Sequence, residues 1–386
     1  MSDGWVSRRK TERESANPFS PTFGTAPPFL AGRADTLARI AEAVETGPHH
    51  PDYTMLILGT RGSGKTALLN ALEHEAERAS WVTISTSAST PGLCSRITRA
   101  ALTLADQIVK RKPKLTTVKA AGFTATWDTS KPSEIPDLRT ALTSLASKLD
   151  TKRIGVLVTV DEFQAAETGE ARELAATVQH VTRREQHPLL FVSAALPDIE
   201  DSLLADPGMT FFQRCARAHL NPLSDQDASE ALLRPICDRG SSIAEADLRA
   251  AVAATSGYPY MVQLIGYYSW EASNSPMSGL ARADVEDGIA RAEVALIDQV
   301  VKPTWVSLSN QDKRFLKAMA QDEDVSRVSD IAERIQRSND FARSYRARLI
   351  KAEIIVPAAR GLVRFRHRIL GDWLRSDDSP SIPSDN

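Results

Sequence analysis

GTRGSGKTALLN, residues 59–70, is the stretch that decides the fold. It follows a short apolar run, YTMLIL (53–58), and leads into a segment with helical spacing (67–79). The spacing G-x-x-x-x-G-K-[ST] is that of a phosphate loop. Such a loop lies between a buried strand and a helix, because the backbone N–H groups at a helix N-terminus point at an anion. The sequence therefore predicts a nucleotide-binding α/β domain.

The residue types of this loop have predicted tasks. Glycines let the backbone curl around phosphate oxygens. We expect Lys65 to reach the β- and γ-phosphates and the Thr66 hydroxyl to bind Mg²⁺. The residues predicted to hold the nucleotide are Gly59, Thr60, Arg61, Gly62, Ser63, Gly64, Lys65, Thr66 and Ala67.

A second motif supplies acidic groups for hydrolysis. The run IGVLVTVDEFQ (154–164) is apolar and β-branched until Asp161 and Glu162. Ligands of an open parallel sheet bind at the carboxyl ends of its strands, so both acids are expected near the phosphates. We expect Asp161 to hold Mg²⁺ through its water shell, and Glu162 to be the general base for the attacking water. A strand that ends in ordinary solvated acids is the alternative.

Two further positions are candidate catalytic residues. The strand pattern PLLFVSAALPDIE (188–200) should lie between the other two strands, with Ser193 at its polar tip near the γ-phosphate or the attacking water. Arg214 precedes another strand-like stretch and is a candidate for an arginine that stabilises transferred charge in a neighbouring subunit. Arg217 is its rival, and a surface arginine is the alternative.

Composition is that of an ordinary globular protein. The chain has 386 residues, 42% hydrophobic and 25% charged, which suits two or three domains. Its net charge of −2 gives no global attraction to nucleic acid, so such binding needs a local patch. Three cysteines without C-x-x-C spacing favour reduced thiols over disulfides or a zinc site. Without an N-terminal apolar region or a run of ~18 apolar residues, we expect a cytoplasmic protein.

Strand and helix patterns alternate only in the first part of the chain. Short apolar strands between helices are typical of a parallel sheet covered on both faces. One insert, 111–136, breaks the alternation and is interpreted as a short hairpin or loop without an assigned task. The predicted division is an extended arm (1–29), an α/β nucleotide-binding domain (30–222), a helical lid (223–300), a winged helix (301–375) and an acidic tail (376–386).

The predicted winged helix carries a local basic patch. Helices are expected at 309–320, 327–336 and 339–355, followed by two short strands around Gly361. In a helix-turn-helix with a wing, the third helix enters the major groove of DNA. From 337 to 368, nine basic residues minus two acidic ones give +7, the footprint of phosphate contacts.

The residues expected at duplex DNA are Arg343, Ser344, Tyr345, Arg346, Arg348, Arg364 and Arg366, while Leu349 and Ile350 should face the core. A winged helix that serves only as a protein-packing module is the alternative.

Six segments in order resemble AAA+ ATPases of the origin-recognition-like and bacterial ATP-binding protein kind. They are FLAGRADTLARI, GTRGSGKT, LVTVDEFQ, FVSAALPDI, RCARAHLNPLSDQDA and GYPYMVQLIGYYSW. The resemblance extends over about residues 30–375. It implies that Gly32 and Arg33 form a linker turn beside the adenine, and that Tyr258 and Pro259 open the lid helix over the nucleotide.

The same resemblance identifies Asp161 and Glu162 as the Walker B acids and places Ser193 approximately at the sensor 1 position. Two features depart from the family pattern. The segment SGYPYMVQL has no Arg or Lys to act as the second sensor, and sensor 1 is a small hydroxyl where many relatives carry Asn. Both departures favour a slow switch, as in the STAND signalling branch, over a motor.

The sequence thus predicts an ATPase that uses ATP and Mg²⁺. ATP is favoured over GTP because no N/T-K-x-D base-reading motif is present. One interpretation is a switch that binds double-stranded DNA and assembles into a homo-oligomer on ATP binding. The other is a signalling or conflict-system ATPase whose winged helix contacts a protein partner. A kinase or metabolic phosphotransferase is less favoured because no small-substrate site is visible, and no membrane partner is expected.

Overall fold

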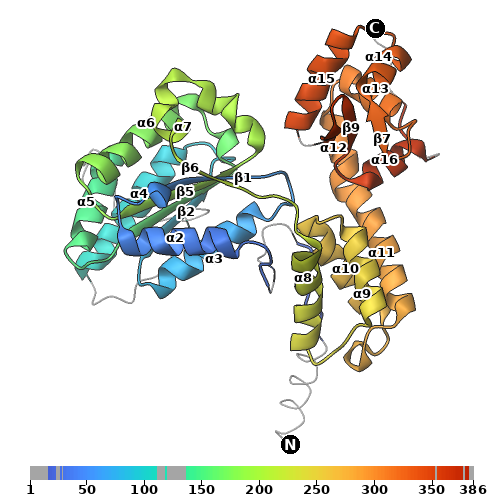
Figure 1. The fold of residues 1–386 in the computed structure, drawn as a ribbon. Helices are drawn as coiled ribbons and strands as arrows, with labels where there is room; N and C mark the ends of the chain where they lie inside the picture. Colours follow the sequence, from blue (N-terminus) through green and yellow to red (C-terminus); the bar gives the residue numbers. More distant parts are fainter. Residues whose placement is uncertain are drawn as a thin grey trace, which may run out of the picture. The chain divides into compact units, whose positions relative to one another are not determined.

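The computed structural model describes residues 16–22, 27, 29–110, 118–119, 136–352, 354–376 and 379–381. The chain divides into two compact units (Figure 1). We call residues 30–221 the α/β unit. The C-terminal unit consists of the described residues from 222 onward, together with arm residues 16–22, 27 and 29.

The α/β unit is built on a parallel sheet with the strand order β3-β2-β4-β5-β1-β6. Its central strand β5 lies between β4 and β1, as the sequence predicts. The strands are β1 (Thr54–Leu58), β2 (Val82–Ser87), β3 (Val118–Lys119), β4 (Val156–Asp161), β5 (Leu189–Ala195) and β6 (Ala216–His219). The α/β fold class is confirmed.

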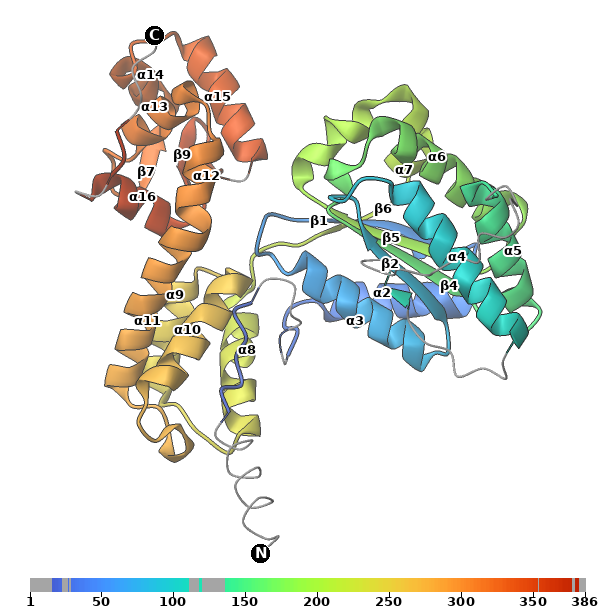
Figure 2. The same cartoon turned by 180° about the vertical axis from the view of Figure 1, so that it is seen from behind.

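Helices cover both faces of this sheet, which explains why the neighbouring strands β1, β5 and β4 are largely apolar and buried (Figure 2). Alternate side chains of one strand reach opposite faces: Leu56 packs in one hydrophobic cluster and Ile57 in the other. One face is covered by α2 (Ala34–Thr46) and α3 (Lys65–Arg78), and the other by α4 (Leu93–Lys110), α5 (Leu138–Asp150), α6 (Thr168–Gln179) and the short α7 (Thr210–Gln213).

The insert expected at 111–136 falls largely outside the described residues. Of this stretch the structure describes the two residues of β3, which pair in parallel with β2, and residue 136. The prediction of a hairpin or loop there remains a prediction.

Four helices form the first part of the C-terminal unit, within the stretch 223–300 where the sequence predicts helices. They are α8 (Asp225–Asp238), α9 (Glu245–Thr255), α10 (Pro259–Ala272) and α11 (Arg282–Leu296). A Cβ atom at Gly288 of α11 would lie 2.1 Å from the Ser269 Oγ of α10, so only glycine permits this close helix packing. Beyond α11, the chain stays helical through a π-helical segment (Ile297–Val301) and α12 (Lys302–Ser307), across the predicted domain boundary at residue 300.

The N-terminal arm packs on α10. Phe19 is 3% exposed, and a Cβ atom at Gly266 would lie 2.5 Å from its ring. Asn17 donates a side-chain hydrogen bond to the Tyr267 carbonyl at 3.0 Å, and the Ser20 N–H donates to Gln263 Oε1 at 3.2 Å. The composition of the arm predicts only an extended segment, because these partners lie about 250 residues away in the chain.

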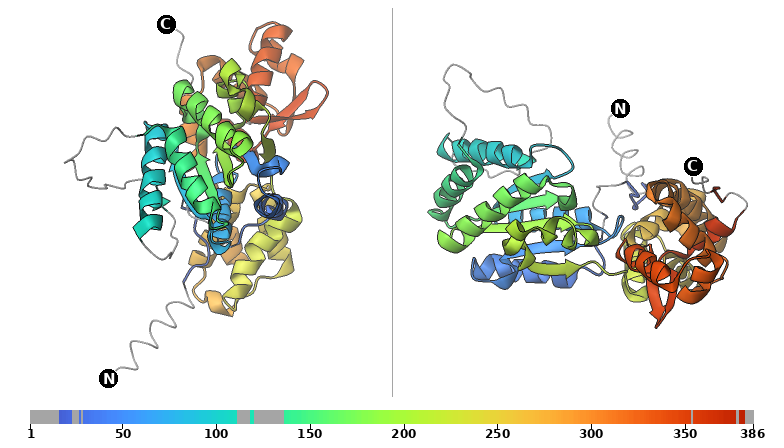
Figure 3. Two further views of the ribbon diagram at one scale, coloured as in Figure 1. Left: turned by 90° about the vertical axis from the view of Figure 1, so that its left-hand side faces the viewer. Right: turned by 90° about the horizontal axis from the view of Figure 1, so that it is seen from above.

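The remainder of the C-terminal unit has the element order of a winged helix (Figure 3, orange and red). The elements are α13 (Asn310–Met319), β7 (Val325–Arg327), α14 (Val328–Arg334), α15 (Asn339–Lys351), β8 (Ile355–Ala359), β9 (Leu362–Phe365) and α16 (Arg368–Arg375). The strands form an antiparallel sheet in the order β7-β9-β8, and Gly361 turns the hairpin with a φ of 76°. Sequence reasoning missed β7, which is three residues long and carries little apolar pattern.

Among the described residues, none of the helices combines the length and the apolar character that a membrane span requires.

Candidate nucleotide site and winged-helix surface

The phosphate loop leads from β1 into α3, and glycines shape its turn. Gly62 and Gly64 have φ angles of 73° and 93°, in the left-handed region that favours glycine. A Cβ atom at Gly59 would lie 2.5 Å from Ser63 Oγ, so the start of the loop also requires glycine. The loop therefore closes tightly over the N-terminus of α3, where backbone N–H groups are available to an anion.

Lys65 lies within the curve of this loop. Its ammonium donates to the carbonyl oxygens of Gly59, at 2.9 Å, and of Thr60, at 2.8 Å. The residue is only 5% exposed, and a buried ammonium requires such acceptors. Ser63 Oγ is also buried, with no hydrogen-bond partner among the described residues. The loop thus presents the Lys65 ammonium and the Ser63 hydroxyl, which suit phosphate oxygens.

The two motifs meet at the carboxyl edge of the sheet. The Thr66 hydroxyl donates to Asp161 Oδ2 at 2.7 Å, although the residues are 95 positions apart. Asp161 Oδ1 accepts the N–H of Glu162 at 2.8 Å. A hydroxyl and a carboxylate are the hard oxygen ligands that Mg²⁺ prefers, so Thr66 and Asp161 fit the predicted metal site.

Glu162 begins a sharp turn after β4. Its φ of 51° is in the left-handed region, which is uncommon for a residue with a side chain and often marks a functional site. The Glu162 carboxylate accepts a hydrogen bond from the side-chain amide of Gln164. Sequence reasoning missed Gln164, whose only signal is its place in the DEFQ run that follows the strand.

Arg33 stabilises the phosphate loop through hydrogen bonds to backbone carbonyls. Its guanidinium donates to the carbonyl oxygens of Gly32 (3.0 Å), Ser63 (3.2 Å) and Asn221 (3.0 Å), and the residue is 7% exposed. The resemblance implies a turn beside the adenine for Gly32 and Arg33, and Gly32 does turn with a φ of 64°. The observed contacts give Arg33 a structural task as well, because it joins the loop to both ends of the α/β unit.

Ser193 lies inside β5 and not at its tip. The strand continues to Ala195, and Ser193 pairs with Leu56 on one side and Val160 on the other. The residue is fully buried, and its Oγ has no hydrogen-bond partner among the described residues. The prediction that Ser193 lies at the polar tip of the strand is therefore wrong, because β5 ends two residues later, at Ala195. A contact of Ser193 with the γ-phosphate remains a prediction.

The two rival arginines differ in their surroundings. Arg217 makes four hydrogen bonds, to the Glu200 carboxylate at 3.1 Å and to three backbone carbonyls before it in the chain. Arg214 is exposed at the C-terminal end of α7. These contacts hold Arg217 within its own subunit, so Arg214 is the better candidate to reach a neighbouring one.

Tyr258 and Pro259 belong to the C-terminal unit, where they begin α10. Tyr258 is 4% exposed, and its ring centroid lies 4.3 Å from that of His367. Burial raises the pKa of the Tyr258 hydroxyl and lowers the pKa of His367 to about 4, so both groups are neutral at pH 7. Their predicted place over the nucleotide remains a prediction.

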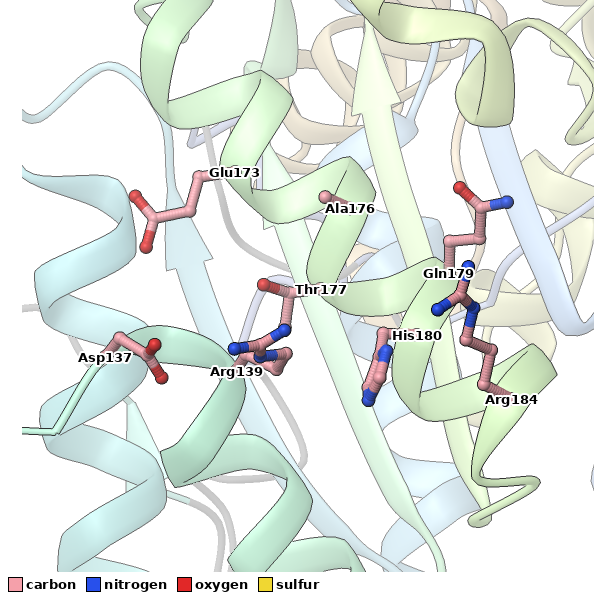
Figure 4. A pocket seen from close by; sticks show the side chains of 8 residues that line it. All are labelled: Asp137, Arg139, Glu173, Ala176, Thr177, Gln179, His180 and Arg184. Carbon is pink, nitrogen blue, oxygen red and sulfur yellow. The ribbon is translucent and has the colours of Figure 1, made fainter.

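A cavity of about 400 Å³ lies beside α5 and α6 (Figure 4). Its lining contains the acidic Asp137 and Glu173 as well as the basic Arg139 and Arg184. None of the phosphate-loop residues or the two Walker acids lines it. Because its lining carries charges of both signs and none of the predicted catalytic or nucleotide-binding residues, this cavity is not the candidate nucleotide site.

The third helix of the predicted winged helix, α15, exposes only part of the predicted DNA-contact set. Arg343 is exposed, with 72% of its side chain accessible, and pairs with Asp340 on the same helix. Ser344 is also exposed. Leu349 is buried and Ile350 packs against the core, as predicted.

Tyr345 and Arg348 have partners inside the domain. Tyr345 stacks on Phe341 with centroids 4.5 Å apart and packs against the core. Arg348 forms an ion pair with the fully buried Asp312 of α13 at 3.0 Å. Both residues thus stabilise the packing of α15, and a role for them at DNA remains a prediction.

The other predicted contacts differ in exposure. Arg346 is half-buried, and its Nε has no hydrogen-bond partner among the described residues. Arg364 on β9 is exposed, as is Arg360 beside the hairpin turn, whereas Arg366 is half-buried. Arg343 on α15 and the wing residues Arg360 and Arg364 are thus exposed, as are Arg337, Arg348 and Arg368.

Comparisons with known proteins agree with this geometry. Residues 30–192 match the AAA ATPase domain family, and residues 298–374 match a domain of unknown function, DUF8462. No curated protein matches the chain at a significant level.

Two solved structures share the fold over nearly the whole chain. The ORC2 protein of Aeropyrum pernix, described in ADPNP-ADP complexes, has a TM-score of 0.62 at 15% identity, over 92% of this chain and 94% of that one. The Walker-type ATPase PABY2304 of Pyrococcus abyssi has a TM-score of 0.64 at 17% identity, over 91% of this chain and 98% of that one. The resemblance to AAA+ ATPases is confirmed.

Proposed function

We propose that this chain, whose residues 30–192 match the AAA ATPase domain family, is a cytoplasmic, magnesium-dependent ATPase that switches slowly between nucleotide states and binds duplex DNA through its winged helix. The observation that carries the ATPase is the hydrogen bond between Thr66 and Asp161, which joins the phosphate loop to the acidic strand end. This bond holds the loop that carries Lys65 and Thr66 next to Asp161 and Glu162 at one edge of the sheet. These are the residues that we propose as the cation, the metal ligands and the base.

The chemistry follows from these positions. Lys65 neutralises charge on the β- and γ-phosphates, and Glu162 accepts the proton of the water that attacks the γ-phosphorus. Mg²⁺, held by Thr66 and Asp161, would neutralise charge on the same phosphate oxygens. The bond to the β-phosphate oxygen breaks, so the products are ADP and phosphate. We expect slow turnover because the start of α10, Pro259 to Leu264, offers no arginine or lysine as a second sensor.

We further propose that Arg214 completes the site of a neighbouring subunit in a homo-oligomer formed on ATP binding. An exposed arginine placed near the γ-phosphate of the next subunit would stabilise charge in the transition state. Arg214→Ala is therefore expected to bind ATP normally and to hydrolyse it at least about tenfold more slowly. Mixing it with Glu162→Gln should restore part of the activity, because some interfaces then pair an intact base with an intact arginine.

Phosphate release from the single and mixed proteins tests this assembly, with light scattering to follow the oligomer. The control is Arg184→Ala, which removes another exposed arginine of the α/β unit. A protein that stays monomeric with ATP and shows no rescue on mixing would leave Arg214 as a surface residue.

DNA binding is supported by the element order of the winged helix and by its exposed arginines. Arg343, Arg360 and Arg364 lie on the third helix and the wing, the elements that contact DNA in this motif. The full chain is expected to bind duplex DNA with an affinity that falls steeply as salt rises, since counterions are released from the phosphates.

The Arg343→Ala/Arg364→Ala double variant tests this surface. We expect its affinity for duplex DNA to fall about tenfold and its salt dependence to weaken by up to about two phosphate contacts. Fluorescence anisotropy across a salt series measures both quantities, and Arg249→Ala, which removes an exposed arginine of α9 in the same unit, is the control. If the parent shows no salt-sensitive DNA binding, the function in which the winged helix contacts a protein partner replaces this one.

A further inference from the structure

Phe163 anchors the turn that carries Glu162. Its side chain is fully buried and packs edge-on against Phe191 and Phe212, with ring centroids 6.2 and 5.3 Å away. Phe163 is the first residue of the short 3-10 helix Phe163–Ala165, which begins directly after Glu162. The anchored ring holds the turn in place, so its two neighbours, Glu162 and Gln164, remain together at the carboxyl edge of the sheet.

Gln164 makes two hydrogen bonds in this turn. Its side-chain oxygen accepts the backbone N–H of Leu196 at 3.1 Å, and its amide nitrogen donates to Glu162 Oε2. The chemistry of the partners determines the orientation of the amide. A backbone N–H can only donate and a carboxylate can only accept, so the reversed amide would lose both bonds.

The two bonds complete a connected row of hydrogen bonds from the first turn of α3 across the ends of β4 and β5. Thr66 donates to Asp161, which ends β4 and accepts the N–H of Glu162. Gln164 then links the Glu162 carboxylate to Leu196, the first residue after β5. Among the described residues no other side chain donates a hydrogen bond to this carboxylate, so Gln164 is the contact that restrains its rotation.

We propose that Gln164 is a positioning residue for hydrolysis: it holds the Glu162 carboxylate in the orientation in which it accepts a proton from the attacking water. The inference rests on the proposed ATPase function and adds a residue to it. A general base must meet its proton within hydrogen-bond distance, and a displacement of about 1 Å can cost on the order of a hundredfold in rate. The hydrogen bonds of the Gln164 side chain go to Glu162 and Leu196 and not to the phosphate loop, so its loss should spare nucleotide binding.

Gln164→Leu is the first test, because leucine has a similar size and no hydrogen-bonding group. We expect kcat to fall about 10- to 100-fold while the Kd for ATP changes less than about twofold. Gln164→Glu separates the two bonds, since a carboxylate still accepts from Leu196 but cannot donate to Glu162. It should be as slow as the leucine variant. Gln179→Leu, the same change at an exposed site on α6, is the control and should match the parent.

A double-mutant cycle distinguishes positioning from general stability. If Gln164 acts only through Glu162, then Gln164→Leu added to Glu162→Gln leaves the residual single-turnover rate unchanged. Full activity of either Gln164 variant, or a further equal loss in the double variant, would overturn the inference. Failure of the proposed function looks different: the parent itself would then hydrolyse no ATP, or Glu162→Gln would hydrolyse it at the parent's rate.

Discussion

Lys65→Ala is expected to abolish ATP binding, with Kd raised at least about 100-fold, or about 3 kcal/mol. The Lys65 ammonium lies inside the curve of the phosphate loop, on the carbonyls of Gly59 and Thr60. It is the cation that we propose meets the β- and γ-phosphates, and alanine supplies neither the charge nor a donor in its place. Isothermal titration calorimetry with ATP and Mg²⁺ measures the loss.

The fold should survive this change. Lys65 contacts loop carbonyls and not the hydrophobic clusters on either face of the sheet, so the melting temperature is expected to stay within a few degrees of the parent's. Lys152→Ala, at an exposed turn of the same unit, is the matched control and should bind ATP normally. Parental ATP affinity in Lys65→Ala would remove the phosphate-loop assignment.

Glu162→Gln is expected to bind ATP with unchanged affinity and to hydrolyse it at least about 100-fold more slowly. Glutamine retains the size of the side chain and an oxygen that can accept from Gln164, but it cannot take a proton from water. Release of phosphate under single-turnover conditions measures the rate, and calorimetry measures the binding.

Two further variants define the result. Glu167→Gln makes the same change at an exposed position five residues later and should hydrolyse ATP like the parent. Asp161→Asn should also raise the Mg²⁺ concentration needed for activity, because Asp161 contacts Thr66 and fits the metal. Undiminished turnover in Glu162→Gln would show that another group acts as the base.

Much of the nucleotide site could be predicted because its parts are local in sequence. The loop glycines, Lys65 and Thr66 lie within eight consecutive positions, and Asp161 and Glu162 follow a recognisable buried strand. The rule that parallel strands bind ligands at their carboxyl ends then brings the motifs together, and the bond between Thr66 and Asp161 bears this out. The order of three helices followed by two strands around Gly361 was also readable, since helical spacing and a glycine turn need no distant partner to be recognised.

Other features required the tertiary structure because their partners are distant in sequence. Charge alone suggested that the arginines from 337 to 368 form one DNA-binding patch, but Arg348 pairs with the buried Asp312. Neither the spacing nor the charge of these residues shows which arginine the domain uses for its own stability.

The same reason applies within the α/β unit. Arg33 reaches the carbonyl of Asn221, 188 positions later, and Gln164 reaches Leu196 on a different strand end. Sequence by itself determined which functional groups lie at the sheet edge, because each of them belongs to a short contiguous motif. Only the tertiary structure decided which side chains orient it, because a hydrogen-bond partner depends on how distant segments pack.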